Sequence, residues 1–220
     1  MDRRIIVTED KSKTLLIPAL NETYHSTHGA KNEAMHVFIA AGLHQIQPNK
    51  EKIRILEMGF GTGLNAILTI QEAQSEIHYT TIEKYPLPLE TIADLDYTEL
   101  LNDPELSKAF NLLHESNWNS EIRINPLFQF KKIEGDLKSI QLEDKTYDLI
   151  YYDAFGPRVQ PNLWTESIFK KLYETLDKNG VLVTYCAQGQ FKRNLKAVGF
   201  DTEALPGPPG KREMTRAIKR

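Results

Sequence analysis

The chain has 220 residues, of which 40% are hydrophobic and 26% are charged, and its formal net charge is −3. These values indicate a globular chain of one main domain and give no overall sign of nucleic-acid binding; no apolar run has transmembrane length, and the polar first ten residues do not resemble a signal peptide. A single cysteine, Cys186, excludes an intrachain disulfide and a cysteine-rich zinc site, so we expect a cytoplasmic protein.

The first fifty residues predict a hairpin followed by a helix. Two β-rich runs at 3–7 and 13–17 flank a polar turn, which is typical of a β-hairpin. Apolar residues recur at helical spacing through 31–46, and Pro48 ends that pattern. We therefore expect residues 1–50 to form an extension that covers the ligand pocket of a main domain at 51–220.

Strands and helices alternate through the rest of the chain. The expected strands are the β-branched or alternating runs at 53–58, 77–83, 128–134, 147–152, 181–186, 201–205 and 214–219. The expected helices are 63–74, a stretch over 86–126 broken by prolines, 165–177 ended by Asn179-Gly180, and 189–197. This order predicts an α/β fold with a doubly wound, mostly parallel sheet of seven strands that finishes in an antiparallel hairpin.

A glycine-rich turn directly follows the first of these seven strands. Residues 57–63 read Glu-Met-Gly-Phe-Gly-Thr-Gly, and glycine permits a tight turn and close approach of the backbone to a ligand. A dinucleotide fingerprint is instead Gly-x-Gly-x-x-Gly, with its acidic residue about 20 residues further on. An acid that ends the strand points to S-adenosylmethionine (SAM), whose sulfonium cation tolerates a nearby carboxylate. Alone the motif is weak, because many strand-to-helix turns contain glycine for structural reasons.

Four consecutive strands of the predicted sheet end in acidic residues. These are Glu57, Glu83, Asp136 and Asp153. Ligands of open parallel sheets bind beyond the carboxyl ends of the strands, where Glu83 could accept both ribose hydroxyls and Asp136 could meet an adenine amine. Any one of these acids could instead cap a helix. Their coincidence with the glycine turn favours a functional role for the set.

A second group of residues follows the tyrosine-rich strand at 147–152. Residues 153–157 read Asp-Ala-Phe-Gly-Pro and resemble the Asp/Asn-Pro-Pro-aromatic loop of amino-group methyltransferases, with a displaced proline. Asp153 could accept a hydrogen bond from an attacking amine, and the ring of Phe155 could pack on a base. The structural alternative is an ordinary strand-to-helix turn in which Pro157 only restricts the backbone.

The C-terminal segment is more basic than the rest of the chain. From Gln188 to Arg220 there are eight Lys or Arg against three acidic residues, which permits a local phosphate-binding face or, equally, a solvated helix face.

In these motifs the chain resembles the methyltransferase half of the MnmC family of bifunctional bacterial tRNA-modifying proteins. The matching strings cover nearly the whole chain: Tyr24-His25-Ser26 with Gly29 and Glu33, residues 57–65, 83–87, 135–136, 153–157 and 161–164, and Gly210-Lys211-Arg212-Glu213-Met214. The strings Gly-Phe-Gly-Thr-Gly-Leu-Asn and Lys-Arg-Glu-Met are far more specific than a generic glycine turn.

The resemblance implies methyl transfer from SAM to the amine of 5-aminomethyl-2-thiouridine at the tRNA wobble position. It implies a SAM pocket made by Tyr24, Glu57, Gly59, Gly61, Thr62, Gly63, Asn65, Glu83, Lys84, Asp136 and Leu137, and catalysis by Asp153 with Phe155 beside it. In this hypothesis Phe155 or Trp164 would stack on the base, although Trp164 is at least as well explained as a core residue. Phosphates of the anticodon stem would be bound by Lys192, Arg193, Lys196, Lys211, Arg212 and Arg216.

One departure from the family concerns the second activity of the bifunctional proteins. They carry an FAD-dependent oxidase domain, whereas this sequence contains no second glycine fingerprint. We expect a stand-alone methyltransferase that receives the aminomethyl base from a separate enzyme. Met58, Ala154 and Gly156 are smaller departures that put the substrate in some doubt.

The sequence is also compatible with two other classes of function. One is another enzyme on the same fold, either a small-molecule or protein methyltransferase or an aminopropyl transferase of the spermidine synthase type. The other is a SAM-binding module that binds tRNA without catalysis. We expect no metal, because the six histidines lack ligand spacing, and His25 and His28 are better explained as loop residues.

Overall fold

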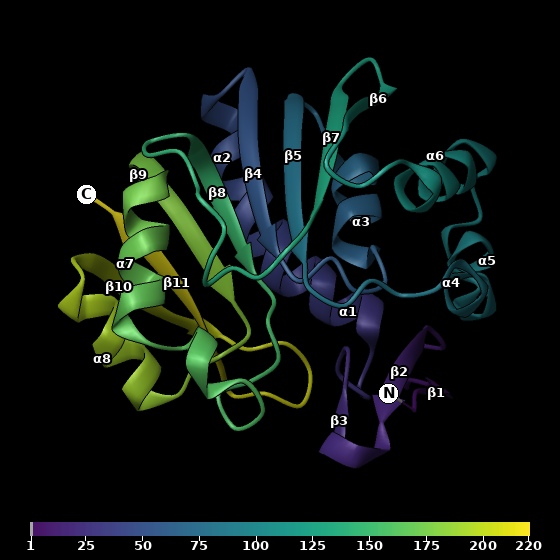
Figure 1. Ribbon diagram of the computed structural model, residues 1–220, viewed down its shortest axis with the longest axis horizontal. Helices are drawn as coiled ribbons and strands as arrows, with labels where there is room; N and C mark the ends of the chain where they lie inside the picture. Colours follow the sequence, from purple (N-terminus) through teal and green to yellow (C-terminus); the bar gives the residue numbers. More distant parts are fainter. Residues whose placement is uncertain (1) are drawn as a thin grey trace.

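An eight-stranded sheet forms the centre of the protein in the computed structural model, which describes residues 2–220 (Figure 1). The strand order is β10-β11-β9-β8-β4-β5-β7-β6, and the five strands from β9 to β7 run parallel. The strands of this sheet are β4 (Lys52–Met58), β5 (Glu76–Glu83), β6 (Glu121–Asn125), β7 (Phe128–Glu134), β8 (Tyr147–Tyr152), β9 (Leu176–Thr184), β10 (Phe200–Pro206) and β11 (Glu213–Lys219).

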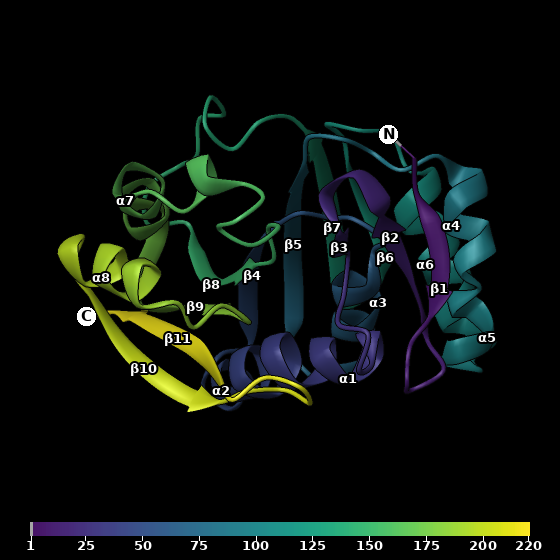
Figure 2. The same cartoon turned by 90° about the horizontal axis from the view of Figure 1, so that it is seen from below.

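Helices cover both faces of this sheet (Figure 2). The helices of the chain are α3 (Leu64–Glu72), α4 (Leu89–Leu95), α5 (Tyr97–Leu101), α6 (Pro104–Glu115), α7 (Glu166–Thr175), α8 (Gly189–Ala197) and an N-terminal helical run. Of these, α4 and α5 lie at the edge of the molecule beside α6 (Figure 1). That run consists of α1 (Ala30–Ala34), the π-helical η2 (Met35–Leu43), α2 (His44–Ile46) and the 3₁₀ turn η3 (Gln47–Asn49). Two further 3₁₀ turns are η1 (Pro18–Leu20) and η4 (Pro161–Leu163).

Alternate residues of the buried strands supply two separate cores. Ile55 of β4 belongs to the core shared with η2 and α3, whereas its neighbour Leu56 belongs to the core shared with α7 and α8. Tyr151 and Tyr152 of β8 divide in the same way. Since successive side chains of a strand point to opposite faces, near-continuous apolar strands are what a sheet covered on both faces requires. The predicted doubly wound fold and its antiparallel C-terminal hairpin, β10 with β11, are confirmed.

The N-terminal segment forms a second, three-stranded antiparallel sheet. It contains β1 (Arg4–Val7), β2 (Lys13–Ile17) and β3 (Glu22–Thr23), and β1 and β2 form the predicted hairpin. Figure 1 shows this sheet at the lower edge of the molecule, separate from the main sheet. The helical run that follows buries Val37 and Phe38 in the same core as Ile55.

Two predictions of local structure were wrong. Residues 121–125, expected within a helical stretch, form the eighth strand β6, which pairs antiparallel with β7 at the edge of the sheet. Asn179-Gly180 was expected to end the helix of 165–177, but α7 ends at Thr175. The two residues lie within β9, where Asn179 has φ of 63° and the pairing with β8 shifts register.

Among residues 2–220, we find no helix that has both the length and the apolar character to cross a membrane.

Candidate active site

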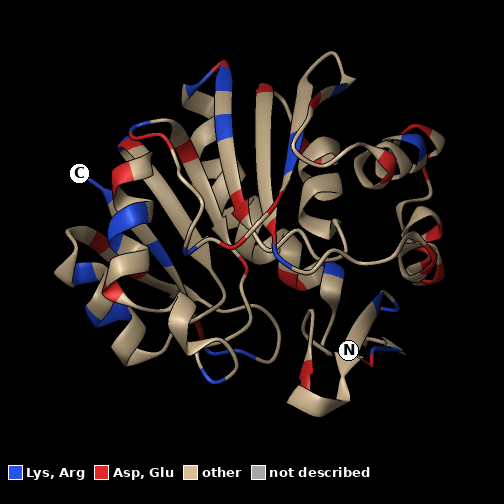
Figure 3. Cartoon of the chain, in the orientation of Figure 1, with Lys and Arg blue, Asp and Glu red and all other residues tan. Residues whose placement is uncertain are grey.

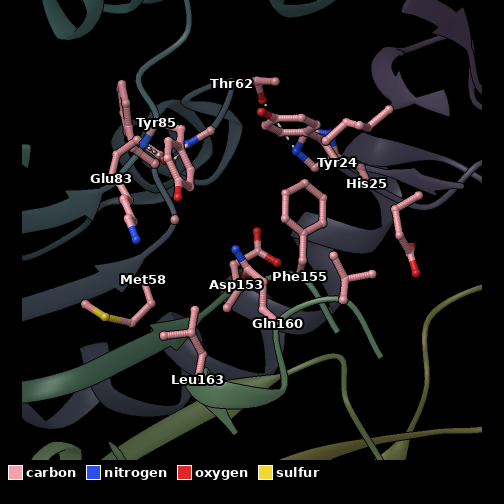
Figure 4. Close-up of a pocket in the computed structure, with 18 of the residues that line it drawn as sticks. Tyr24, His25, Met58, Thr62, Glu83, Tyr85, Asp153, Phe155, Gln160 and Leu163 are labelled. Carbon is pink, nitrogen blue, oxygen red and sulfur yellow. Dashed lines mark hydrogen bonds between the residues drawn. The ribbon is translucent and has the colours of Figure 1, made fainter. Parts of the chain in front are cut away.

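A cavity of about 920 Å³ lies at the carboxyl ends of the central strands. Its wall includes the glycine turn after β4, the ends of β5 and β7, and the loop after β8, with residues of the N-terminal segment on the opposite side. Figure 4 shows Glu83 and Tyr85 on one side, Tyr24 and Phe155 on another, and Asp153 between them. The size is in the range of sites that bury a drug-sized ligand.

The glycine turn adopts a conformation that other residues rarely tolerate. Gly59 has φ of 91°, and a Cβ at this position would lie 2.9 Å from the carbonyl oxygen of Asp153. Gly61 has φ of 49° and lies against the ring of Tyr24. The absence of side chains lets the β4 and β8 loops meet and leaves backbone facing the cavity, which is the cradle that a cofactor such as SAM requires.

Glu83 connects the end of β5 to the glycine turn. Its Oε2 accepts a hydrogen bond from the backbone N–H of Gly61 at 3.1 Å, and its Oε1 accepts one from the N–H of Tyr85 at 2.7 Å. Glu83 also lines the cavity. A carboxylate has about four acceptor positions, so both oxygens can still accept further hydrogen bonds from a ligand.

Asp136 occupies the equivalent place after β7. It accepts hydrogen bonds from the N–H of Lys138 at 3.0 Å and from Lys84 Nζ at 3.0 Å. Partial burial raises its pKa, but the hydrogen bonds from Lys138 and Lys84 outweigh this effect and hold the pKa below its ordinary value. Lys84, Asp136 and the largely buried Leu137 all line the cavity. Their contact with a cofactor stays a prediction.

Asp153 lies at the cavity wall in contact with Asn65. Its Oδ2 accepts a hydrogen bond from Asn65 Nδ2 at 2.8 Å, and its backbone N–H binds the carbonyl of Met58. Burial, together with the nearby Glu33 carboxylate, raises the pKa of Asp153 to about 7, although Asn65 and Lys211 both act to lower it. The group therefore changes charge near neutral pH, as expected of an acid-base residue.

Three predicted site residues take a different place from the one expected. Glu57 is fully buried behind the wall and bonds to Asn65, and Gly63 precedes the first turn of α3 against His114. Neither lines the cavity. Trp164 is only 4% exposed and packs edge to face on Tyr152 and Phe191, so stacking on a substrate base is excluded and the core alternative holds. Its Nε1 supports the Phe155 carbonyl from behind at 2.8 Å.

Two of the basic residues predicted to contact phosphate, Lys211 and Arg212, line a surface groove next to the cavity. Tyr185 and Lys211 line both hollows, so the two adjoin. Lys211 pairs with Glu33 at 2.6 Å and lies over the ring of Tyr185, and Lys192 pairs with Glu213 at 2.9 Å.

The other predicted phosphate contacts differ in exposure. Arg212 lines the groove and is exposed, while exposed Arg193 bonds to Gln190 within α8. Lys196 is also exposed on α8, whereas Arg216 pairs with Glu203 at 2.7 Å. Figure 3 shows Lys and Arg along α7, α8 and the C-terminal hairpin.

Sequence reasoning gave no role to several residues that contribute to the site. His25 lines the cavity, with Nδ1 at 3.0 Å from Thr14 Oγ1 and Nε2 at 3.4 Å from Thr62 Oγ1, and burial lowers its pKa to about 4. Glu33 is buried, and its Oε2 accepts the N–H of Ser26 at 2.7 Å. The signal for both was their place in the first string of residues that matches the family, 24–33.

Residues 108–220 match the sequence profile of a family described as S-adenosyl-L-methionine-dependent methyltransferase, and this range is just over half of the chain. The chain belongs to this family. The predicted cofactor class is thereby confirmed, and the glycine cradle and strand-end acids of the cavity are consistent with it.

Individual relatives agree with the predicted resemblance. The tRNA 5-methylaminomethyl-2-thiouridine biosynthesis bifunctional protein MnmC of Cupriavidus metallidurans is 30% identical, over 91% of this chain and 32% of that protein. The protein of the same name from Aromatoleum aromaticum is also 30% identical, over 99% of this chain and 35% of that protein. The chain thus spans about a third of the length of these relatives.

Solved structures show the same fold. MnmC2 from Aquifex aeolicus has a TM-score of 0.75 at 24% identity and covers 100% of this chain and 70% of that one. A spermidine synthase in complex with the transition-state analogue AdoDATO has a TM-score of 0.58 at 17% identity, covering 99% and 71%. Identities this low establish the shared fold and do not distinguish the reactions.

Proposed function

We propose that the chain is a SAM-dependent N-methyltransferase that acts on the aminomethyl group of 5-aminomethyl-2-thiouridine at the tRNA wobble position. The observation that carries the proposal is the position of Asp153, which lines the cavity beside the glycine turn and changes charge near neutral pH. The names of the relatives supply the substrate class.

The cofactor would be held at the strand ends. Glu83 would accept hydrogen bonds from the ribose hydroxyls. Asp136 and Leu137 would contact the adenine. The backbone at Gly59 and Gly61 would face the rest of the SAM molecule. When bound, SAM supplies a methyl group whose carbon forms a bond to the substrate nitrogen as the carbon–sulfur bond breaks. Thr62, Asn65 and Lys84 complete this part of the wall.

Asp153 would prepare the amine for attack. Its Oδ2 is engaged by Asn65, and among residues 2–220 no hydrogen bond to its Oδ1 is found, which leaves that oxygen for an N–H of the substrate. In its ionised form Asp153 orients the nitrogen lone pair and accepts the proton that the methylated amine releases. Phe155, also on the wall, offers its ring to the base.

The residues around Asp153 argue against an aminopropyl transferase. A polyamine substrate carries several positive charges and favours surrounding acids. The acids Glu22 and Glu33 also line this cavity, but Arg158 pairs with Glu22 and Lys211 pairs with Glu33, and Arg212 lines the adjoining groove. Cations at this end instead favour a substrate whose remainder is negatively charged, such as an RNA backbone.

The N-terminal segment would act as a cover for the cofactor pocket. Tyr24 and His25 reach the cavity from residues 1–50, while the glycine turn, the strand-end acids and the basic groove all belong to 51–220. We propose that residues 1–50 cover the cofactor pocket and that residues 51–220 form the methyltransferase domain. The aminomethyl base itself would be supplied by a separate activity, and the partner of the domain would be the anticodon loop.

The test incubates the purified chain with labelled SAM and tRNA from cells that lack this methylation step, followed by nucleoside mass spectrometry. A methyl group on 5-aminomethyl-2-thiouridine, absent with Asp153→Asn, is the expected result. SAM binding by calorimetry without transfer to tRNA would contradict the proposed reaction and favour a small amine substrate or a non-catalytic binding module.

A further inference from the structure

Glu57 and Asp153 share the side-chain amide of one residue. Asn65 Nδ2 donates one hydrogen bond to Glu57 Oε1 at 3.1 Å and one to Asp153 Oδ2 at 2.8 Å. An amide nitrogen has two hydrogens, so both are used by carboxyl groups. Asn65 is 3% exposed in the first turn of α3, and Glu57 is 0% exposed at the end of β4.

The surroundings of Glu57 contain no compensating cation. The polar groups that face it are the Asn65 amide, the Asp153 carboxyl, and the hydroxyls of Tyr79, Thr81 and Tyr151. Among residues 2–220, no lysine, arginine or histidine pairs with Glu57, in contrast to buried Asp148, which pairs with Lys50 and Arg54. An isolated buried carboxylate is costly, so a carboxyl in this position retains its proton.

The environment of Asp153 differs in this respect. The titratable groups near Asp153 are Glu33, Lys211 and Glu57, with the Tyr185 hydroxyl also close, so that unlike Glu57 it has a cation nearby. Asp153 reaches the cavity, whereas Glu57 lies behind it. Burial, and to a smaller extent the Asp153 carboxyl, raises the pKa of Glu57, in accord with its position behind the wall.

We propose that Glu57 is a positioning residue that works as a neutral carboxylic acid, fixing the Asn65 amide so that it orients Asp153 and leaves Asp153 as the single negative charge of the pair. The inference rests on the proposed function, since it takes Asp153 as the group that faces the amine. Glu57 Oε1 accepts from Asn65, which leaves Oε2 to carry the proton.

The proposal replaces the contact with the cofactor that the sequence suggested for Glu57. A negative charge on Glu57 would repel the charge on Asp153 and raise the pKa of Asp153. A smaller fraction of the protein would then carry the ionised Asp153 that binds the amine at neutral pH. A neutral Glu57 avoids this repulsion and still accepts the second Asn65 hydrogen bond. Glutamine reproduces the neutral acid, whereas alanine removes the acceptor.

The first experiment is infrared spectroscopy of the whole chain near pH 7.5, which needs no substrate. We expect a carbonyl band of a protonated carboxylic acid that persists in Asp153→Asn and is largely lost in Glu57→Gln, where only the minor protonated fraction of Asp153 contributes. Absence of this band in the parent protein would overturn the proposal even if methylation of tRNA succeeds. Its presence would stand even if the substrate assignment fails, so the two failures are distinguishable.

The second experiment compares pH profiles of kcat for Glu57→Ala and Glu57→Gln. Glu57→Ala removes the hydrogen bond between Asn65 and a neutral acceptor, so it should lower kcat by about twofold to tenfold. Because Asn65 is then less well oriented toward Asp153, the acidic limb of the pH profile should move to higher pH. Glu57→Gln should recover most of the lost kcat, and the acidic limb of its pH profile should lie where it does in the parent protein. If glutamine behaves like alanine and weakens SAM binding, Glu57 acts through its charge and the proposal is wrong.

A loss of folding would be recognised separately. Asp148→Asn changes another buried strand carboxyl, at the start of β8 and not on the cavity wall, and serves as the matched control for destabilisation. It should lower the unfolding midpoint without moving the acidic limb of kcat. A shift of that limb in the control as large as in Glu57→Ala would show that destabilisation alone produces the effect and would overturn the positioning role.

Discussion

The rings of Tyr24 and Phe155 meet edge to face, with centroids 5.2 Å apart. Tyr24 follows the short strand β3, whereas Phe155 follows β8 of the main sheet. The same tyrosine ring lies against Gly61 of the glycine turn. One side chain of the N-terminal segment thus contacts both the proposed cofactor cradle and the proposed catalytic loop.

Removal of this ring should weaken cofactor binding. An edge-to-face pair is worth about 0.5–1.5 kcal/mol beyond its buried area, and Tyr24→Ala also uncovers the glycine turn. We expect the Kd for SAM to rise by about tenfold, which corresponds to about 1.4 kcal/mol, in isothermal titration calorimetry. Tyr24→Phe keeps the ring and is the matched control. Equal affinity in the alanine variant and the parent would show that the segment does not cover the cofactor.

A side chain at Gly61 should have a related effect by a different route. Alanine at φ of 49° is strained, and its Cβ would lie 3.3 Å from Tyr24 Cδ1. Gly61→Ala should therefore displace the tyrosine and reduce SAM affinity while the chain remains folded. Gly156→Ala, whose Cβ would be 3.6 Å from the Tyr185 hydroxyl, is an unstrained control outside the turn. Parent-like SAM affinity in Gly61→Ala would contradict the close fit of turn, ring and cofactor.

Much of the fold could be predicted because the decisive signals are local. The limits of β8 and α8 agree with the predicted 147–152 and 189–197, since apolar runs and helical spacing are properties of adjacent residues. Strand β6 was missed because five residues at a sheet edge, paired only with β7, carry too short an alternation. Asn179-Gly180 was misread because a left-handed residue serves equally in a helix end and in a strand irregularity.

The site divides in a similar way. The strand-end acids could be placed together because the carboxyl ends of parallel strands share one edge. The ion pair of Lys211 with Glu33 joins residues 178 positions apart, and no pattern in the sequence connects them. Burial of Glu57 beneath the wall likewise follows from packing of α3 on β4 and could not be separated from a cavity-facing position by motif alone.

Activity should depend on the ionisation of Asp153. Its pKa of about 7 means that the carboxylate, the form that accepts a hydrogen bond from the amine, is lost as the pH falls through 7. The kcat of methyl transfer should therefore rise with pH across this value. Asp153→Asn should reduce kcat by about two to four orders of magnitude while SAM affinity is kept.

The same variant separates the enzyme's titration from that of the substrate. Any residual activity of Asp153→Asn should retain only the pH dependence of the substrate amine. An unchanged limb near pH 7 in this variant would assign the titration to another group. Loss of SAM binding would instead move Asp153 from the substrate side of the cavity to the cofactor side.

Stability should decline as the pH rises, in part because of Glu57. Burial raises its native pKa to about 8, so the native state holds a proton that the unfolded chain releases above its ordinary value near 4.5. The contribution of this group is therefore full at acidic pH and is lost as the pH rises toward 8. One unit of pKa difference corresponds to about 1.4 kcal/mol.

Glu57→Gln removes this titration. Its free energy of unfolding, measured with denaturant at about pH 5.5 and 8.5, should fall less between the two values than that of the parent, by more than about 1 kcal/mol. The exposed change Glu105→Gln on α6 is the control and should follow the parent. Parallel pH dependence in Glu57→Gln and the parent would show that Glu57 is not protonated in the native state.

Binding of tRNA should depend on the groove that adjoins the cavity. Arg212 is exposed in this groove and Arg193 is exposed on the neighbouring helix α8, so each is available to a phosphate. When binding neutralises phosphates, the logarithm of the binding constant falls linearly with the logarithm of salt concentration, with a slope of about −0.7 for each contact with a single strand. Arg212→Gln and Arg193→Gln should each reduce the magnitude of that slope by about one and leave SAM affinity unchanged.

Lys108→Gln removes an exposed cation from α6, where it pairs with Glu105 away from the groove, and should preserve the slope. Filter binding or fluorescence anisotropy over a range of salt concentrations measures the effect. A salt-independent affinity, or the same loss in all three variants, would rule out this groove as the path of the RNA while leaving the SAM site intact.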